Sequence, residues 1–172
     1  MRDPRNKKAA TLLKSIRIPL RSKRRHLEHA ARTAVAATLS LVVARLFRLP
    51  EAYWAAITTL VVMQSTLGAA LTVSGQRFAG TALGAALGAL LASCFEPNVL
   101  IFAAAVFVAG IMCAALGLER NAYRYASITV AIVMLVARNE PPWVIAGHRF
   151  AEISIGIAVG LIVTAIWPER SA

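Results

Sequence analysis

The chain has 172 residues, of which 58% are hydrophobic and only 16% are charged, and its mean hydropathy is +0.64. A soluble domain of this length would have to expose much of that apolar surface to water, so the composition excludes an ordinary soluble protein. A helix of about 20 apolar residues crosses the roughly 30 Å hydrocarbon core of a bilayer and satisfies its own backbone hydrogen bonds. The composition therefore predicts an all-α integral membrane protein.

The first segment, residues 1–28, is strongly basic. Residues 2–25 contain ten lysines and arginines and one acid, Asp3. No small-residue cleavage site follows, so we do not expect a removed signal peptide. Basic residues beside a first span favour the cytoplasmic side, and the leucines and isoleucines among them favour contact with anionic lipid. Because no nucleic-acid reading motif accompanies the charge, we expect no nucleic-acid partner.

The uncharged stretches that follow predict a transmembrane domain over residues 29–168. Six spans are expected, near residues 30–49, 52–70, 75–95, 98–118, 123–138 and 143–167. With the N-terminus inside, fifteen of the 19 lysines and arginines fall on the inner side and four on the outer side. This bias predicts a multi-pass protein with both termini in the cytoplasm and residues 169–172 as a short cytoplasmic tail.

The chain contains an internal repeat. Seven of fourteen positions are identical between residues 75–88 and 147–160, including Arg77 with Arg149. Upstream, residues 55–63 and 126–134 agree at five of nine positions, at an offset of 71 instead of 72. Two matching blocks separated by a one-residue shift indicate an old duplication.

The two copies are expected to cover about residues 29–96 and 97–168. Each copy has three spans, an odd number, so the second copy must be inverted in the membrane relative to the first. Inverted repeats are typical of transporters, whose substrate path commonly lies at the repeat interface. The predicted fold is therefore six transmembrane helices arranged as two inverted three-helix repeats.

Small residues recur at a spacing of four in both copies. They are Gly80, Gly84 and Gly88 in the first copy and Gly156 and Gly160 in the second. This spacing aligns the glycines on one face of a helix and lets two helix backbones approach closely. We expect these residues to pack helices together and not to touch substrate.

Basic residues recur near the ends of the predicted spans. Only residues 33–44 separate Arg32 from Arg45, a rise of about 18 Å along a helix. At least one of the two must snorkel to the surface or face the protein interior. Snorkelling accounts for Arg32, Arg48 and Arg138.

The candidate pathway residues are Arg77, Arg149, Gln64 and Arg45. Gln64 is expected about 16 Å into the second span, measured from Tyr53. Glu152 lies three residues after Arg149, so the two side chains can pair on one helix face. A charge inside a bilayer costs about 2.5–3.5 kcal/mol, which makes the carboxylate a candidate for proton coupling. The alternative is that Glu152 only neutralises Arg149.

The sequence has no arrangement typical of an enzyme or a metal site. It contains no metalloprotease, phosphate-loop or paired-cysteine motif, and its three histidines do not have metal-ligand spacing. We therefore expect no catalysis, no metal and no cofactor.

Two motifs carry a resemblance to a known family. Tyr53-Trp54-Ala55 with Ile57-Thr58, followed by Arg77-x-x-Gly80-Thr81-x-x-Gly84-x-x-x-Gly88, resembles the fusaric acid resistance and aromatic acid exporter family. The chain is more distantly similar to the aluminium-activated malate transporters of plants. The resemblance covers about residues 30–168. The second copy departs from the motif, because Glu152-Ile153 replaces Gly80-Thr81.

The resemblance implies a six-helix membrane domain that exports or conducts organic anions, as a homodimer, with arginines along the path. Arg77 would be the family's arginine and Arg149 its counterpart in the second copy. Arginine suits this role because its planar guanidinium is always charged and pairs with a carboxylate through two parallel hydrogen bonds. The predicted function is inner-membrane efflux of small organic anions, with aromatic carboxylates as the favoured substrates. The alternatives are a passive anion channel of the same architecture and a membrane scaffold or accessory subunit without transport of its own.

Overall fold

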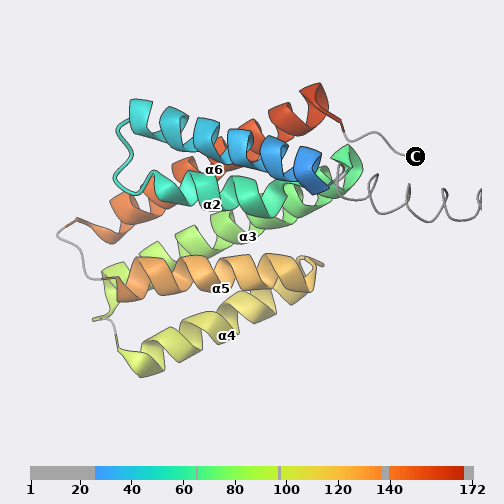
Figure 1. Ribbon diagram of the computed structural model, residues 1–172. Helices are drawn as coiled ribbons and strands as arrows, with labels where there is room; N and C mark the ends of the chain where they lie inside the picture. The colour runs from blue at the N-terminus through green and yellow to red at the C-terminus, as the bar shows by residue number, and fades with distance from the viewer. Residues whose placement is uncertain (1–25, 65, 97, 137–139, 169–172) are drawn as a thin grey trace, which may run out of the picture.

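The computed structural model describes residues 26–64, 66–96, 98–136 and 140–168, and within them every regular element is a helix (Figure 1). The prediction of an all-α protein is confirmed for these residues. Most of the basic N-terminal segment, the tail at 169–172 and Arg138 lie outside the described residues. A first helix occupies residues 26–46. The others are α2 (Tyr53–Val62), α3 (Leu67–Cys94), α4 (Val99–Ala115), α5 (Arg120–Leu135) and α6 (Pro142–Ile166).

Polar caps and proline define where three of these helices begin. The Thr66 hydroxyl accepts a hydrogen bond from the first turn of α3 at 3.3 Å, and the Asn98 side chain accepts one from the first turn of α4 at 2.9 Å. Pro142 opens α6, where its missing N–H group has no helical partner to lose. Each cap satisfies a backbone donor that the helix itself leaves without a partner.

The first helix and α4 end in the same way. Arg48 and Gly117 have positive φ angles of 56° and 65°. The residue after each of them, Leu49 or Leu118, donates a backbone hydrogen bond to the carbonyl five positions earlier, at 3.2 and 2.9 Å. This is the Schellman termination, which normally uses glycine in the left-handed conformation. Arg48 adopts that conformation at a cost of about 1 kcal/mol or more.

The predicted boundary between the second and third spans was wrong. Helix α2 ends at Val62 and α3 begins at Leu67, so the expected span over 52–70 is broken. The ten residues of α2 rise only about 15 Å, about half of the hydrocarbon core. The residues across the break, Met63-Gln64-Ser65-Thr66, are uncharged, so a span predicted from the absence of charge runs through them. As a consequence, Arg77 lies ten residues inside α3 and not in its first turn.

The helices form a layered bundle centred on α3 (Figure 1). Helix α3 packs against both α5 and α6, while α2 packs against α6 and α4 against α5. Helices α3 and α6 run in opposite directions, as the colours in Figure 1 show. Arg32 donates a hydrogen bond to the carbonyl oxygen of Trp167 at 2.9 Å, so the first helix and the end of α6 meet at one end of the bundle.

The bundle buries polar and charged side chains among its apolar core residues and exposes large apolar side chains on its outer surface. Its outward faces expose large apolar side chains on each of the helices, among them Leu46, Leu90, Leu100, Phe107 and Ile166. The buried polar and charged residues are Arg32, Ser40, Thr58, Thr59, Ser74, Arg77, Thr81, Thr129, Arg149, Glu152 and Thr164. Of the described helices, α3 and α6 are long and apolar enough to cross a membrane. An apolar exterior around buried charged residues is typical of a membrane protein.

Candidate functional site

Two close helix crossings frame the interior. At Gly84 in α3, an added Cβ would overlap the carbonyl oxygen of Ala126 in α5 and lie 2.8 Å from its Cα. At Gly156 in α6, an added Cβ would overlap the carbonyl oxygen of Ala55 in α2 and lie 2.6 Å from Thr58 Cβ. Gly80 makes a similar approach to α5, and Gly88 and Gly160 lie in looser contact with the same partner helices. The glycine faces therefore join α3 to α5 and α6 to α2.

The first polar cluster surrounds Arg149, whose side chain is 1% exposed. Its Nη1 atom lies 3.3 Å from Oε2 of Glu152 and 3.6 Å from Oε2 of Glu51. The backbone N–H of Glu51 donates to Glu152 Oε1 at 3.0 Å, and the Trp54 indole N–H donates to Glu51 Oε2 at 3.1 Å. The guanidinium also lies over the Trp54 ring, 3.8 Å from its centroid. Arg149 is thus paired with two carboxylates and an aromatic face.

The second polar cluster surrounds Arg77, which is 6% exposed. Its Nε and Nη2 atoms both donate to the hydroxyl oxygen of Thr58, at 3.2 and 3.1 Å. The guanidinium lies 4.8 Å from the centroid of the Tyr125 ring. Within the described part of the chain, no carboxylate lies close enough to Arg77 to form an ion pair.

The two arginines occupy corresponding positions with different partners. Arg77 and Arg149 are 72 residues apart, and the aromatic residues beneath them, Trp54 and Tyr125, are 71 apart. Phe78 and Phe150, the residues that follow the arginines, contact each other with ring centroids 5.0 Å apart.

The carboxylates break this correspondence. Glu152 corresponds to Gly80, and Glu51 corresponds to Ala122. Gly80 packs directly against Ala122, so the space taken by two carboxylates beside Arg149 is filled by backbone near Arg77. Arg149 is therefore neutralised by carboxylates of the protein, whereas Arg77 is a buried cation that contacts the Thr58 hydroxyl and the Tyr125 ring.

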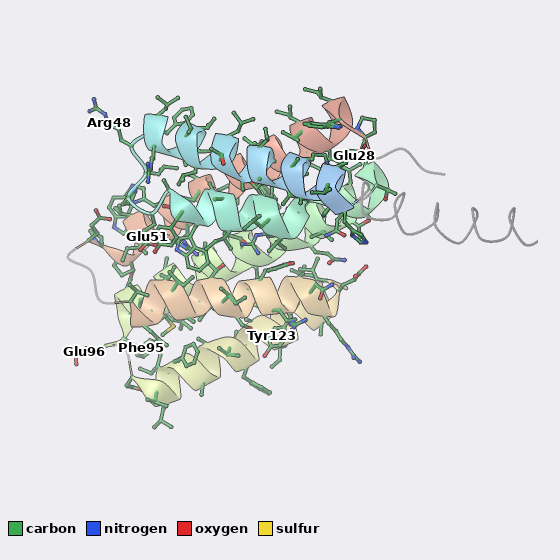
Figure 2. The ribbon with its side chains drawn as sticks, in the orientation of Figure 1. Glu28, Arg48, Glu51, Phe95, Glu96 and Tyr123 are labelled. Atoms are coloured by element: carbon green, nitrogen blue, oxygen red, sulfur yellow. The ribbon has the colours of Figure 1, made fainter. Side chains whose placement is uncertain are left out.

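Helix α2 connects the two clusters. Trp54 contacts Arg149, and Thr58, one turn later, contacts Arg77. The Thr58 hydroxyl also donates to the carbonyl oxygen of Trp54 at 2.8 Å. The side chain of Glu51 lies at the start of α2, at the end of the bundle where Arg48 also projects (Figure 2). Both arginines therefore contact the same short helix.

The remaining predicted pathway residues lie elsewhere. Gln64 is outside any helix, in the connection between α2 and α3, so its expected place within the second span was wrong. Its side chain is half-buried and donates to the carbonyl oxygen of Val61 at 3.2 Å. Arg45 is exposed near the end of the first helix, as a snorkelling side chain would be.

Arg32 does not snorkel, contrary to the prediction. Its side chain is 1% exposed and donates to two backbone carbonyl oxygens, that of Gln64 at 2.6 Å and that of Trp167 at 2.9 Å. Gln64 and Trp167 lie just beyond the C-terminal ends of α2 and α6, where backbone carbonyl oxygens have no partner within the helix. Arg32 therefore ties the first helix to the ends of two others.

Replacing Arg32 by alanine is expected to lower stability by about 2–4 kcal/mol, because two charge-assisted hydrogen bonds to carbonyl oxygens are lost. Thermal unfolding of the purified protein in detergent measures this change. Arg45→Ala is the matched control, since it removes an exposed arginine from the same helix and is expected to change stability by less than about 0.5 kcal/mol. Equal unfolding temperatures in the two variants would contradict the conclusion that Arg32 ties the first helix to the ends of α2 and α6.

Four contributors to the clusters were not predicted as site residues: Glu51, Trp54, Thr58 and Tyr125. The repeat contained a signal for two of them, because extending the alignment of residues 55–63 and 126–134 by one position pairs Trp54 with Tyr125. Glu51 has no such signal, since its counterpart is an alanine. Among the described residues, no group of three or more potential metal ligands is assembled.

The chain matches the family model described as fusaric acid resistance protein-like over residues 37–163. It is 31% identical over 149 residues to inner membrane protein YeeA of Escherichia coli (strain K12), a match that covers 83% of this chain and 41% of that protein. It is 30% identical over 152 residues to the uncharacterized transporter YdhK of the same strain, covering 83% of this chain and 23% of YdhK.

The chain spans less than half the length of these relatives. No solved structure gives a significant match. The family model covers both glycine faces and both arginine clusters, and the chain belongs to the fusaric acid resistance protein-like family.

Proposed function

We propose that this chain forms a transport domain of the inner membrane that exports small organic anions, aromatic carboxylates in particular. The observation that carries the proposal is Arg77, a buried guanidinium for which the described residues supply no carboxylate. A buried charge without a counter-ion is costly, and an anionic ligand would remove that cost. Arg149 is assigned a structural or coupling role, because Glu51 and Glu152 already neutralise it.

The chemistry around Arg77 suits an aromatic carboxylate. A guanidinium offers two parallel N–H donors to a carboxylate, and Thr58 offers a hydroxyl beside them. The half-buried Tyr125 ring supplies an apolar face on which a substrate ring can stack. When a carboxylate binds, it competes with Thr58 for the guanidinium.

The proposed architecture is a pair of inverted three-helix repeats with both termini in the cytoplasm. Support comes from the corresponding glycine crossings, from the corresponding arginine–aromatic pairs and from the opposite directions of α3 and α6 (Figure 1). The contact between Phe78 and Phe150 lies where a two-fold axis relating the repeats would pass. In inverted-repeat transporters the substrate site lies near this interface.

The relatives support transport in preference to a scaffold role. YdhK is named a transporter, and YeeA is named an inner membrane protein. A passive channel of the same architecture would use the same arginine, so the distinction between channel and transporter depends on measured flux.

The proposal is tested in cells that express the chain and take up labelled benzoate or benzamide. The two probes share a ring, but only benzoate carries a carboxylate. We expect expressing cells to retain less benzoate than cells with an empty vector, and equal amounts of benzamide. Unchanged retention across a panel of aromatic carboxylates, with the protein present in the membrane, would contradict the proposed function.

A further inference from the structure

Two buried hydroxyl groups on α3 have no hydrogen-bond partner within the described residues. Ser74 is 4% exposed and Thr81 is 1% exposed, and neither hydroxyl oxygen has a partner. Thr33, in the first helix, also lacks one but is half-buried. Buried polar groups without a partner are rare in native proteins, and each needs an explanation. The other buried serine and threonine hydroxyls in the described part of the chain have partners: Ser40, Thr58, Thr59 and Thr129 donate to backbone carbonyl oxygens, and Thr164 donates to the sulfur of Met63.

The two hydroxyls flank Arg77. Ser74 lies three residues before Arg77 and Thr81 lies four residues after it, so the three side chains share one face of α3. The rise of an α-helix places Ser74 about 4.5 Å and Thr81 about 6 Å from Arg77 along the helix axis. Arg77 itself has no carboxylate partner among the described residues. This buried face of α3 therefore presents a charged donor between two neutral donors, each about one turn away.

The second copy of the repeat lacks these hydroxyls. Ala146 corresponds to Ser74 and Ile153 corresponds to Thr81, and both lie in buried apolar clusters. The corresponding positions therefore pack well without a hydroxyl. The hydroxyls occur in the copy whose arginine has no carboxylate partner among the described residues, and the apolar residues occur in the copy whose arginine contacts two carboxylates. This association connects the hydroxyls with an anion at the arginine and not with packing.

We propose that the face of α3 from Ser74 to Thr81 lines the route of the transported anion, and that the two hydroxyls receive its carboxylate on either side of Arg77. This inference rests on the proposed function. A transport path needs several sites, each favourable enough to enter and weak enough to leave. A carboxylate that leaves the guanidinium meets a hydroxyl donor about one turn away in either direction. In the proposed topology, Ser74 lies on the cytoplasmic side of Arg77 and Thr81 on the outer side.

Thermal unfolding in detergent without an added anion tests whether the two hydroxyls lack partners. We expect Ser74→Ala and Thr81→Val to unfold at or above the temperature of the parent, because each removes a buried polar group that has no partner. Thr59→Val is the matched control, since the fully buried Thr59 hydroxyl donates to the carbonyl oxygens of Ala55 and Gly156 at 3.0 Å. This control should unfold at a lower temperature than the parent. Equal destabilisation by Thr81→Val and Thr59→Val would overturn the assignment.

Uptake of benzoate into liposomes tests the route itself. We expect Ser74→Ala and Thr81→Val each to lower the maximum rate by about tenfold, a factor of the order of one hydrogen bond to a charged group. The rate falls because a carboxylate leaving Arg77 loses its next donor. The benzoate concentration at half-maximal uptake should change by less than about twofold, since Arg77 still binds the anion. Thr81→Ser keeps the hydroxyl and should keep the rate of the parent.

The maximum rate and the half-maximal concentration together decide the outcome. A maximum rate equal to that of the parent in Ser74→Ala or Thr81→Val would overturn the route. A higher half-maximal concentration with an unchanged maximum rate would also overturn it, because the hydroxyls would then hold the anion at Arg77 and not pass it on. If the parent takes up no benzoate, the proposed function fails and the route fails with it, whereas the unfolding comparison still decides whether the two hydroxyls lack partners.

Discussion

Gly84→Ala is expected to destabilise the bundle by about 3 kcal/mol or more, and Gly84→Leu is expected to prevent folding. The new Cβ would overlap the carbonyl oxygen of Ala126, and backbone atoms of a packed helix cannot move aside as a flexible side chain can. Separating α3 from α5 would also remove the packing on which helix association in lipid depends. Gly156→Ala should have a similar effect, because it meets Ala55 in the same way.

The chain provides matched controls for these substitutions. Gly75 in α3 and Gly147 in α6 have no atom within 4 Å of an added Cβ, so alanine fits at both positions. Alanine also has the higher helix propensity, by about 1 kcal/mol. Gly75→Ala and Gly147→Ala should therefore leave size-exclusion profiles and unfolding temperatures unchanged or slightly improved. If Gly84→Ala unfolds at the same temperature as Gly75→Ala, the close approach of α3 to α5 is wrong.

The second large effect is a difference between the two arginines. Arg149→Gln should lower stability by about 3–5 kcal/mol, because it removes the guanidinium from the buried carboxylate of Glu152 and the half-buried carboxylate of Glu51. Arg77→Gln removes a buried cation that has no carboxylate partner among the described residues, and this offsets the loss of its bonds to Thr58. We expect Arg77→Gln to change stability by less than about 1 kcal/mol. Thermal unfolding in detergent separates the two outcomes.

A double variant tests whether the lower stability expected for Arg149→Gln is caused by the loss of positive charge. Glu152→Gln in the Arg149→Gln background removes the buried carboxylate that Arg149 contacted and should restore part of the lost stability. The Arg77→Gln variant should gain nothing from Glu152→Gln. Equal destabilisation by Arg149→Gln and Arg77→Gln, with no recovery in the double variant, would contradict the conclusion that Arg149 forms structural ion pairs and Arg77 does not.

Much of the architecture could be predicted from sequence. Long uncharged stretches are a direct consequence of burial in lipid, and they predicted helices that overlap each of the observed ones. The glycine spacing predicted faces that the structure places in contact with α5 and α2. The repeat paired Arg77 with Arg149, and each lies over the aromatic ring at the corresponding position, Tyr125 or Trp54.

Other features depend on tertiary contacts that hydropathy does not encode. The break between α2 and α3 falls in an uncharged stretch, and the cap at Thr66 marks the start of α3. Burial of Arg32 depends on carbonyl oxygens at two distant helix ends. Glu51 was overlooked because it lies about a hundred residues from Glu152 in the chain and beside it in the fold. The pairing of Arg149 with Glu152, three residues away, could be predicted from the sequence, whereas the second carboxylate beside Arg149 could not.

Uptake of benzoate into liposomes tests directly whether Arg77 binds the transported anion. The measurement compares the purified parent protein with Arg77→Gln. Both proteins should be present at equal amounts and with similar unfolding temperatures. We expect at least a tenfold loss of benzoate uptake in Arg77→Gln, the effect of removing charge-assisted hydrogen bonds worth about 1.5–3 kcal/mol. Uptake by Arg77→Gln at the rate of the parent protein would contradict the claim that Arg77 binds the transported anion.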